Sequence, residues 1–464
     1  MKKFKAPNTI LLVLSLLIAM AALTWVIPGG EYDRVDQDGR EVVDPDSFEY
    51  IESEPATLTD LILAPVGGFN DPVAVRIIVF IFIVSGSFSI IQRTGAFDKL
   101  IQRIAVFFTE RPQFKLWLIP VFMFFFAFMG STFGMSEEVI VFIPLFIPLA
   151  IALGFDSITG VAIPFMGARL GFAGAFMNPF TVGISQELSE LPLFSGWELR
   201  VILWFTLTLI GCTMVMLYAR SILKNPERSP VYDLDRSRDD MLKPETELTP
   251  FYRRDGIILS LFATAIIFLI YGVQQWGWFI DELTGLFLTL GIISAVAGRL
   301  SGDEAVEAFL EGMRNVMLAV VIVALSRSIL LLMTDARVID TILHFLSGTV
   351  EGLPALISTQ LMLGVQTVIN IIVPSGSGQA ALTIPILAPL GDLVGISRQT
   401  VVLIFQLGDG LSNLIIPTAG VTMAVLGMAR IPWEVWAKWM IWRLAILYLV
   451  AMLFIAIAVG IGYS

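Results

Sequence analysis

Two long apolar stretches of this chain are each interrupted by a short polar segment, Ser131-Thr132-Phe133-Gly134 in the first half and Ser375-Gly376-Ser377-Gly378 in the second. The next apolar stretch of each half is broken as well, at Asn178-Pro179-Phe180-Thr181 and at Gly408-Asp409-Gly410 with Ser412-Asn413 and Pro417-Thr418. Unpaired backbone at membrane depth is costly unless it lines a cavity or a bound solute. Broken apolar segments at corresponding positions of two halves are the best sequence indication of a transporter's substrate site.

The composition predicts an all-α polytopic membrane protein. Of the 464 residues, 56% are hydrophobic and only 15% are charged, whereas an ordinary globular domain carries roughly 25% charged residues. Apolar runs near the ~20 residues that span a bilayer recur along the whole chain. The single cysteine, Cys212, and the single histidine, His344, leave no cysteine or histidine cluster for a metal ion. The net charge of -11 argues against a nucleic-acid partner.

Basic residues in the short loops predict the orientation of the chain. Residues 29–72 are acidic, with only Arg34 and Arg40 as basic residues, and are predicted to form an extracytoplasmic loop. The basic connection 93–115 and the linker 221–254 are predicted to be cytoplasmic. We expect a retained N-terminal helix within 1–28, an N-terminus inside and a C-terminus outside, in a bacterial cytoplasmic (inner) membrane. Four tryptophans are expected near the membrane interfaces, namely Trp276, Trp278, Trp433 and Trp436.

The same charge rule predicts two re-entrant hairpins. If 116–153 crossed the membrane once, the basic linker would fall outside, so this segment is predicted to turn at its polar break and return inside. It belongs to a first inverted repeat over 73–220. The second half, 255–464, repeats the pattern upside down, with a hairpin over 354–394 that begins and ends outside. Each hairpin is followed by an unwound helix.

The breaks supply the candidate substrate site. Helix ends at a hairpin tip present free N–H groups that suit a carboxylate, while freed carbonyls and hydroxyls suit Na⁺. For a single break, a packing kink of small residues is the simpler reading, but four breaks in two inverted pairs favour a site. The candidate substrate-binding residues are Ser131, Thr132, Gly134, Asn178, Ser375, Gly376, Ser377, Gly378, Asn413 and Thr418, and a Na⁺ is expected near Ser131, Asn178, Ser377 and Asn413.

Charged residues at membrane depth are candidates for coupling or charge recognition, because they are costly there. Glu137 and Glu138 follow the first tip, where they hold a cation, relay a proton, pair with an ammonium, or simply favour the N-terminus of the returning arm. Arg169 is expected to pair with a glutamate or with a substrate carboxylate, and we favour the structural pair. Asp409 is a candidate ligand, and Arg327 marks a contact of the scaffold.

The motifs at these breaks resemble one known family. They are Gly130-Ser-Thr-Phe-Gly-Met-Ser-Glu-Glu138, the Asn178-Pro-Phe break, Pro374-Ser-Gly-Ser-Gly-Gln-Ala380, and Gly408-Asp-Gly-Leu-Ser-Asn413 with Pro417-Thr418. Over nearly the whole chain they are similar to the YfcC-type branch of the DcuC-like carriers, in the broad ion transporter superfamily. This superfamily includes the divalent-anion:sodium symporters and the aminobenzoyl-glutamate transporter type. The resemblance implies inverted repeats, an elevator mechanism and a homodimer.

The resemblance also places functional positions. The superfamily's cation and substrate positions correspond to Ser131, Asn178, Ser375–Gly378 and Asn413. The sodium symporters carry Ser-Asn-Thr at their tips, whereas this chain has Ser-Thr-Phe and Ser-Gly-Ser. Both Na⁺ and H⁺ therefore stay candidates for the coupling ion.

The acidic residues near the breaks decide the expected substrate. The family labels point both to C4-dicarboxylates and to basic amino acids, and Glu137, Glu138 and Asp409 disfavour a dianion. We expect a secondary active transporter of small carboxylate-bearing solutes, amino acids and especially basic ones, working by symport or exchange. A C4-dicarboxylate transporter is the alternative substrate class, and an ion channel is the alternative kind of protein. An enzyme is not expected, and no cofactor is needed beyond a coupling ion.

Overall fold

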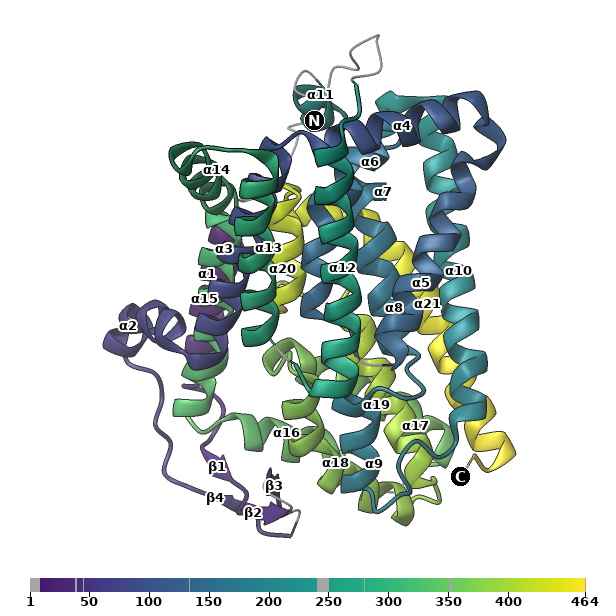
Figure 1. Ribbon diagram of the computed structural model, residues 1–464. Helices are drawn as coiled ribbons and strands as arrows, with labels where there is room; N and C mark the ends of the chain where they lie inside the picture. The colour runs from purple at the N-terminus through teal and green to yellow at the C-terminus, as the bar shows by residue number, and fades with distance from the viewer. Residues whose placement is uncertain are drawn as a thin grey trace, which may run out of the picture.

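The protein is built almost entirely from helices, many of which run between two opposite ends of the molecule (Figure 1). This computed structural model describes residues 9–37, 40–44, 46–132, 134–239, 250–278, 280–349 and 353–463. Phe133 of the first polar segment, residues 1–8 of the N-terminal range and 240–249 of the linker lie outside the described residues. Six of the described helices are long and apolar enough to cross a membrane, or seven if α14 and α15, bent by 44°, form one span.

The elements of residues 9–239 include small strands as well as helices. The helices are α1 (Thr9–Leu23), α2 (Leu58–Asn70), α3 (Pro72–Arg93), α4 (Ala96–Glu110), α5 (Leu118–Thr132), α6 (Ile143–Ala152), α7 (Ser157–Val161), α8 (Gly167–Ala173), α9 (Ile184–Leu188), α10 (Trp197–Lys224) and α11 (Tyr232–Asp239). Short 3-10 helices cover Pro112–Trp117, Glu137–Phe142 and Pro226–Arg228, and π-helices cover Ala162–Met166 and Pro179–Gly183. Strand β1 (Gly30–Glu31) pairs antiparallel with β4 (Glu49–Tyr50), and β2 (Arg34–Gln37) with β3 (Arg40–Val43).

The elements after the linker are helices only, within the described residues. They are α12 (Arg253–Trp276), α13 (Ile280–Gly298), α14 (Gly302–Asn315), α15 (Met317–Asp335), α16 (Ile339–Gly348), α17 (Ala355–Ile372), α18 (Gly376–Leu393), α19 (Arg398–Ser412), α20 (Gly420–Met428) and α21 (Trp433–Ile461). The order from α15 to α21 matches the order from α3 to α10: a long helix, a shorter one, two arms joined by a polar tip, a broken helix and a long helix.

The two arms of each polar tip return to the end of the molecule where they started. The Lys115 ammonium, just before α5, donates to the carbonyl oxygen of Leu153, just after α6, at 3.2 Å. Both ends of this segment therefore lie together, near α4 and α11 (Figure 1). The arms α17 and α18 lie at the opposite end of the molecule, where α21 also ends.

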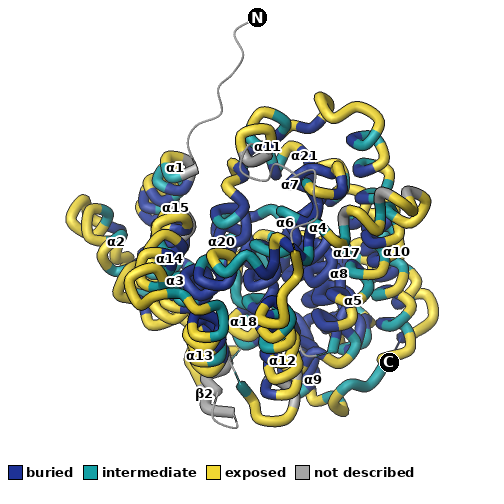
Figure 2. The backbone as a smooth tube through the Cα atoms, turned by 45° about the horizontal axis from the view of Figure 1, so that its top comes forward, coloured by how far each residue is buried: buried dark blue, intermediate teal, exposed yellow. Residues whose placement is uncertain are grey.

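The broken helices form the centre of the structure. Every residue of Ser157–Ala173 is buried, and so is every residue of Gln399–Ser412. In Figure 2 this buried centre is surrounded by the outward, exposed sides of α10, α12 and α13. Glycines allow the close contacts there, since a Cβ atom at Gly171 would lie 1.9 Å from the carbonyl oxygen of Ala127 and one at Gly410 would lie 2.4 Å from the Cα of Ala173.

Part of the acidic range 29–72 is ordered against the helices. It contains the four strands and α2, whose first turn is closed by a capping box between Thr57 and Asp60. Helix α2 packs on α15 so closely that a Cβ atom at Gly68 would lie 2.1 Å from the carbonyl oxygen of Ala324. Directly after α2, Asp71 caps α3 and accepts a 2.7 Å hydrogen bond from Arg327. Arg327 therefore joins α15 to the start of α3.

One local expectation was wrong. The second unwound region does not begin at Gly408, because α19 continues through Asp409 and Gly410 to Ser412 and the break covers only 413–419. Trp436, one of the four tryptophans expected near the interfaces, is completely buried within the protein. Its indole N–H donates to the carbonyl oxygen of Leu414 at 2.8 Å, so a polar group released by the break holds it inside.

The position of the hairpin ends is testable by labelling. Cys212 is the sole cysteine and is buried, so introduced cysteines are reported against a low background. We expect Gln113→Cys and Ala152→Cys to react with a membrane-impermeant maleimide from the same side, and Leu356→Cys and Leu393→Cys from the other side. Labelling of Gln113→Cys and Ala152→Cys from opposite sides would contradict the hairpin.

Candidate functional site

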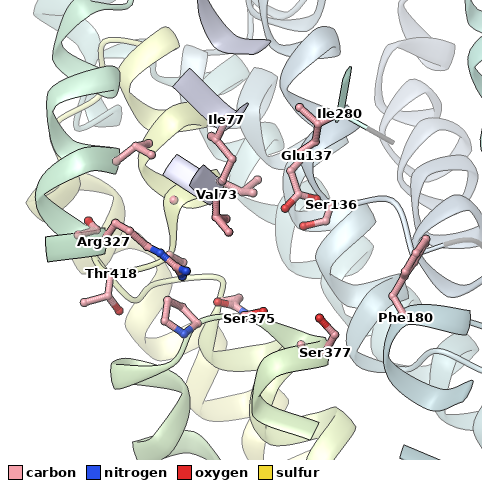
Figure 3. Close-up of a pocket in the computed structure, with 18 of the residues that line it drawn as sticks. Val73, Ile77, Ser136, Glu137, Phe180, Ile280, Arg327, Ser375, Ser377 and Thr418 are labelled. Carbon is pink, nitrogen blue, oxygen red and sulfur yellow. The ribbon is translucent and has the colours of Figure 1, made fainter. Parts of the chain in front are cut away.

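One cavity of about 320 Å³ lies where the two polar tips meet α3 and α15. Figure 3 shows Ser136 and Glu137 of the first tip on the right and Ser375 and Ser377 of the second tip below. Arg327 of α15 lies on the left, with Val73 and Ile77 of α3 above the centre. The lining residues are Val73, Ala74, Arg76, Ile77, Gly134, Ser136, Glu137, Glu138, Arg169, Phe172, Phe180, Thr181, Ile280, Val323, Ser326, Arg327, Leu330, Pro374, Ser375, Gly376, Ser377, Asn413, Thr418, Ala419, Gly420 and Val421. Segments far apart in the chain thus share one polar space.

The first tip is held by a left-handed glycine and a glutamate. Gly134 has φ +73°, which few other residues adopt, and a Cβ atom there would lie 2.6 Å from Oδ1 of Asn178. The Glu138 carboxylate accepts a 2.9 Å hydrogen bond from the backbone N–H of Ser136 and so closes the turn. The carbonyl oxygen of Ser131 accepts from the N–H of Met177 at 3.1 Å. The tip is therefore bound to the break that follows it.

Several predicted ligands are used within this tip rather than in the cavity. The hydroxyls of Ser131 and Thr132 both donate to the carbonyl oxygen of Phe128, at 2.9 and 2.8 Å, and neither residue lines the cavity. Asn178 is completely buried, and its Oδ1 accepts from the N–H of Phe180 at 2.9 Å. These three residues position Gly134, Ser136 and Glu137, which do line the cavity.

The second tip presents the start of α18 to the cavity. Ser375 is the N-cap residue of α18, where its hydroxyl accepts from the N–H of Gly378 at 3.4 Å. Ser375, Gly376 and Ser377 line the cavity, whereas Gly378 does not. The Thr418 hydroxyl donates to the carbonyl oxygen of Ile371 at 2.7 Å. This bond connects the second break to α17, the first arm of the second hairpin.

Arg169 is a buried cation that forms no ion pair with any residue that the structure describes. Its side chain is 4% exposed, and its guanidinium lies 5.7 Å from the ring centres of Phe165 and Phe172. Within the described residues no carboxylate lies within 4.0 Å of it, and its Nε has no hydrogen-bond partner. The favoured structural ion pair is therefore not formed. Glu137, Asp409 and Glu138 still interact with Arg169 electrostatically at longer range.

Asp409 lies directly behind the second tip. It is completely buried, and its Oδ1 accepts from the side-chain amide of Asn413 at 3.1 Å. In the described part of the chain its Oδ2 has no partner, and a Cβ atom at Gly376 would lie 3.4 Å from that oxygen. Asn413 lines the cavity while Asp409 does not. The second tip therefore separates Asp409 from the cavity.

Several residues of the site were not among the sequence candidates. Ser136, Phe172, Thr181 and Ser326 line the cavity. Ser136 stood in the motif of the first tip and Thr181 in a break, whereas no motif contained Phe172 or Ser326. Asn370 donates to the carbonyl oxygen of Asp409 at 3.1 Å and so supports the acid from α17. Asn370 stands in an apolar run with no motif around it, so its role became visible only in three dimensions.

A sequence profile of one carrier family matches residues 6–460, almost the whole chain. The family is DcuC, described as the C4-dicarboxylate anaerobic carrier. The chain belongs to the DcuC family. It is therefore a multi-pass membrane protein of a transporter family, as the resemblance of its motifs had implied.

Two full-length relatives agree with this assignment. YfcC of Escherichia coli K12, named provisionally as a basic amino acid antiporter, is 34% identical over 100% of this chain and 98% of its own. An uncharacterized protein of Haemophilus influenzae is 28% identical over 99% of this chain and 98% of its own. The family and the relative that carry a functional description are thus described as carriers and not as enzymes.

Two solved transporter structures align over nearly the whole chain. The YdaH transporter of Alcanivorax borkumensis has a TM-score of 0.43 and 16% identity, over 98% of this chain and 99% of its own. MtrF of Neisseria gonorrhoeae has a TM-score of 0.40 and 16% identity, over 98% and 95%. Likeness at this level carries no argument about the site.

Replacement of Gly134 tests whether the first tip depends on its close contact with Asn178. In Gly134→Ala the Cβ both disfavours the left-handed backbone and collides with the Asn178 amide, so we expect a loss of roughly 1–3 kcal/mol in stability. Gly364→Ala, in α17 with nothing within 4 Å of the new Cβ, is the matched control and should be neutral or stabilising. Thermal unfolding in detergent measures both, and equal melting temperatures would contradict the contact.

Proposed function

We propose that the protein is a secondary active transporter of small carboxylate-bearing solutes, with amino acids and in particular basic ones as its substrates. The main support is that one cavity is lined by both polar tips, by the unpaired cation Arg169 and by the acids Glu137 and Glu138. Its volume of about 320 Å³ lies within the roughly 300–1,000 Å³ of small-molecule pockets. Ion-coupled symport and exchange both fit this site.

The charges of the cavity suit a solute that carries both signs. A guanidinium recognises a carboxylate through two parallel hydrogen bonds, and Arg169 has no protein carboxylate within ion-pair distance in the described residues. Glu137 is half-buried at the same cavity and has no ion pair there either, so it is suited to an ammonium or guanidinium of the solute. An α-amino acid with a basic side chain supplies both partners.

An elevator mechanism is the proposed motion. The cavity separates the tips and broken helices on one side from α3 and α15 on the other. The first tip is hydrogen-bonded to its break through Met177, and the second break is hydrogen-bonded to arm α17 through Thr418. These bonds support movement of the elements as one body. The proposal includes a homodimer whose outer helices stay fixed, and Na⁺ or H⁺ as the coupling ion. Uptake measured with each ion gradient collapsed separately identifies that ion.

A C4-dicarboxylate is the second candidate substrate. The description of the DcuC family favours it, and the cavity also holds Arg76 and Arg327 beside Arg169. Arg327 is engaged by Asp71 at 2.7 Å, and Arg76 is 3.8 Å from Asp281, so both are partly neutralised. Because Asp71 and Asp281 offset two of the arginines, and Glu137 and Glu138 add negative charge to the cavity, a basic amino acid fits better than a dianion.

Counterflow in proteoliposomes tests the substrate class. We expect unlabelled arginine or ornithine on one side to draw labelled arginine across the membrane in a saturable way, with no effect of succinate or alanine. Exchange of succinate without competition by amino acids would instead establish the dicarboxylate. Conductance without saturable counterflow would overturn the carrier and favour a channel.

Arg169→Gln tests the carboxylate partner of the site. Loss of a charge-assisted hydrogen bond is worth about 1.5–3 kcal/mol, so we expect KM to rise roughly 10-fold to 150-fold. Arg169→Lys should recover part of this loss, because it keeps the charge without the planar fork. Arg76→Gln is the control, since Arg76 is 57% exposed at the rim. Equal effects of Arg169→Gln and Arg76→Gln on KM would contradict a specific role of Arg169.

A further inference from the structure

A second cavity, of about 450 Å³, lies behind the tip of the second hairpin. It is formed by the start of the strand segment, the end of α15, the start of α16 and the beginning of α18. Its lining residues are Gly30, Glu31, Arg34, Leu330, Thr334, Arg337, Ile339, Asp340, Val373, Gly378, Ala381 and Leu382. It lies at the end of the molecule that carries the strands and α16, which the loop charges predict to face outside (Figure 1).

The second hairpin tip and α15 contribute residues to the walls of both cavities. Leu330 lines both cavities. Within the tip, Val373 and Gly378 face the second cavity, whereas the residues between them, Pro374 to Ser377, face the first. The tip thus forms part of the wall between the two spaces, and we call the second cavity the antechamber.

The antechamber contains two arginines whose ion pairs differ. Arg34 is held firmly, because it contacts the 8% exposed Asp340 at 2.9 Å and also donates to the carbonyl oxygen of Tyr32 at 2.6 Å. Arg337 has one partner among the described residues, Glu31 at 3.1 Å, and the two side chains are 48% and 55% exposed. Exposed pairs of this kind are worth only about 0–1 kcal/mol, so the carboxylate of a solute is able to replace Glu31.

The backbone of Arg337 is held in an uncommon conformation. Its φ of +52° is left-handed. For most residues other than glycine and asparagine this backbone conformation costs about 1–2 kcal/mol. The carbonyl oxygen of Arg337 accepts from the N–H of Gly30 at 3.0 Å, so β1 helps to maintain it. Glycine and asparagine are the usual residues just beyond a helix end. Arg337 therefore adds a cation to the antechamber although its left-handed backbone conformation is unfavourable for arginine.

Tyr32 does not add a charge to the antechamber wall. Burial and the neighbouring Asp340 carboxylate raise the pKa of Tyr32 to about 12, and its hydroxyl lies 3.1 Å from Nδ1 of His344. The lining charges are thus two arginines and two carboxylates. When a solute carboxylate displaces Glu31, Arg337 remains neutralised and Glu31 turns to solvent.

We propose that this antechamber is an access site, in which Arg337 binds the carboxylate of the solute before the tip of the second hairpin admits it to the central cavity. The ligand class is the small carboxylate-bearing solutes, so this inference rests on the proposed function. Arg337 acts here as a binding residue for arrival from one side of the membrane only. Solutes that arrive from the other side do not pass it.

Arg337→Gln and Glu31→Gln form a matched pair for the test. Initial rates of labelled arginine uptake are measured in right-side-out and in inverted membrane vesicles. For Arg337→Gln we expect KM in right-side-out vesicles to rise about threefold to fivefold, because the arginine is half exposed. The maximal rate and the kinetics in inverted vesicles should be unchanged. For Glu31→Gln, which frees the arginine, we expect an unchanged or lower KM. Arg337→Asn tolerates the left-handed backbone and serves as the second variant should Arg337→Gln fold poorly.

Three results would overturn the access site. The first is an unchanged KM in both arginine variants. The second is a rise of KM in Glu31→Gln equal to that in Arg337→Gln, which would indicate a merely structural ion pair. The third is an equal effect in the two vesicle orientations. Absence of saturable uptake by the unsubstituted protein, for arginine and for succinate, would overturn the proposed function and the access site with it. Saturable uptake with unaltered Arg337 variants would overturn the access site alone.

Discussion

The structure depends on how it satisfies backbone groups that its broken helices release in an apolar environment. Each such group costs several kcal/mol if it is left unpaired in lipid. In the second break, the indole groups of Trp433 and Trp436 donate to the carbonyl oxygens of Ile415 and Leu414, at 2.7 and 2.8 Å. In the first, the N–H of Met177 donates to the carbonyl oxygen of Ser131 at 3.1 Å. These bonds allow irregular backbone to exist in the middle of the molecule.

The same bonds determine which elements belong together. The Met177 bond attaches the first tip to the first break, and the two indole bonds attach the second break to α21. The two broken helices touch where Gly410 meets Ala173. The opposite wall has its own polar joints, between Arg327 and Asp71 at 2.7 Å and between Lys99 and the buried Asp255 at 2.8 Å. The cavity lies between these two groups, and the Ser326 hydroxyl crosses to the carbonyl oxygen of Pro417 at 3.1 Å. This division supports a motion of one group along the other.

The electrostatics of the cavity are those of an incomplete ion pair. A charge at the centre of a membrane protein is expensive and is normally matched by a partner. Arg169 is nearly fully buried, yet among the described residues it has acids only beyond ion-pair distance. Membership of the DcuC family establishes a carrier but leaves the substrate open, because the family description and the name of YfcC point to different solutes. The unpaired charges are therefore the physical feature that discriminates between them.

The amino-acid sequence by itself determined the class of the protein and the location of its polar interruptions. Hydropathy shows apolar segments, and the motifs at Ser131, Asn178, Ser375 and Asn413 identify the family, because both signals are local in the chain. Only the tertiary structure decided which side chains face the cavity. Ser131 and Thr132 bond back to Phe128 instead. Asp409 stays helical, since Gly408 and Gly410 serve close helix contacts rather than a break. The bonds to Phe128 are local, but the contacts of Gly408 with Gln366 and of Gly410 with Ala173 join distant segments, whose packing residue spacing does not encode.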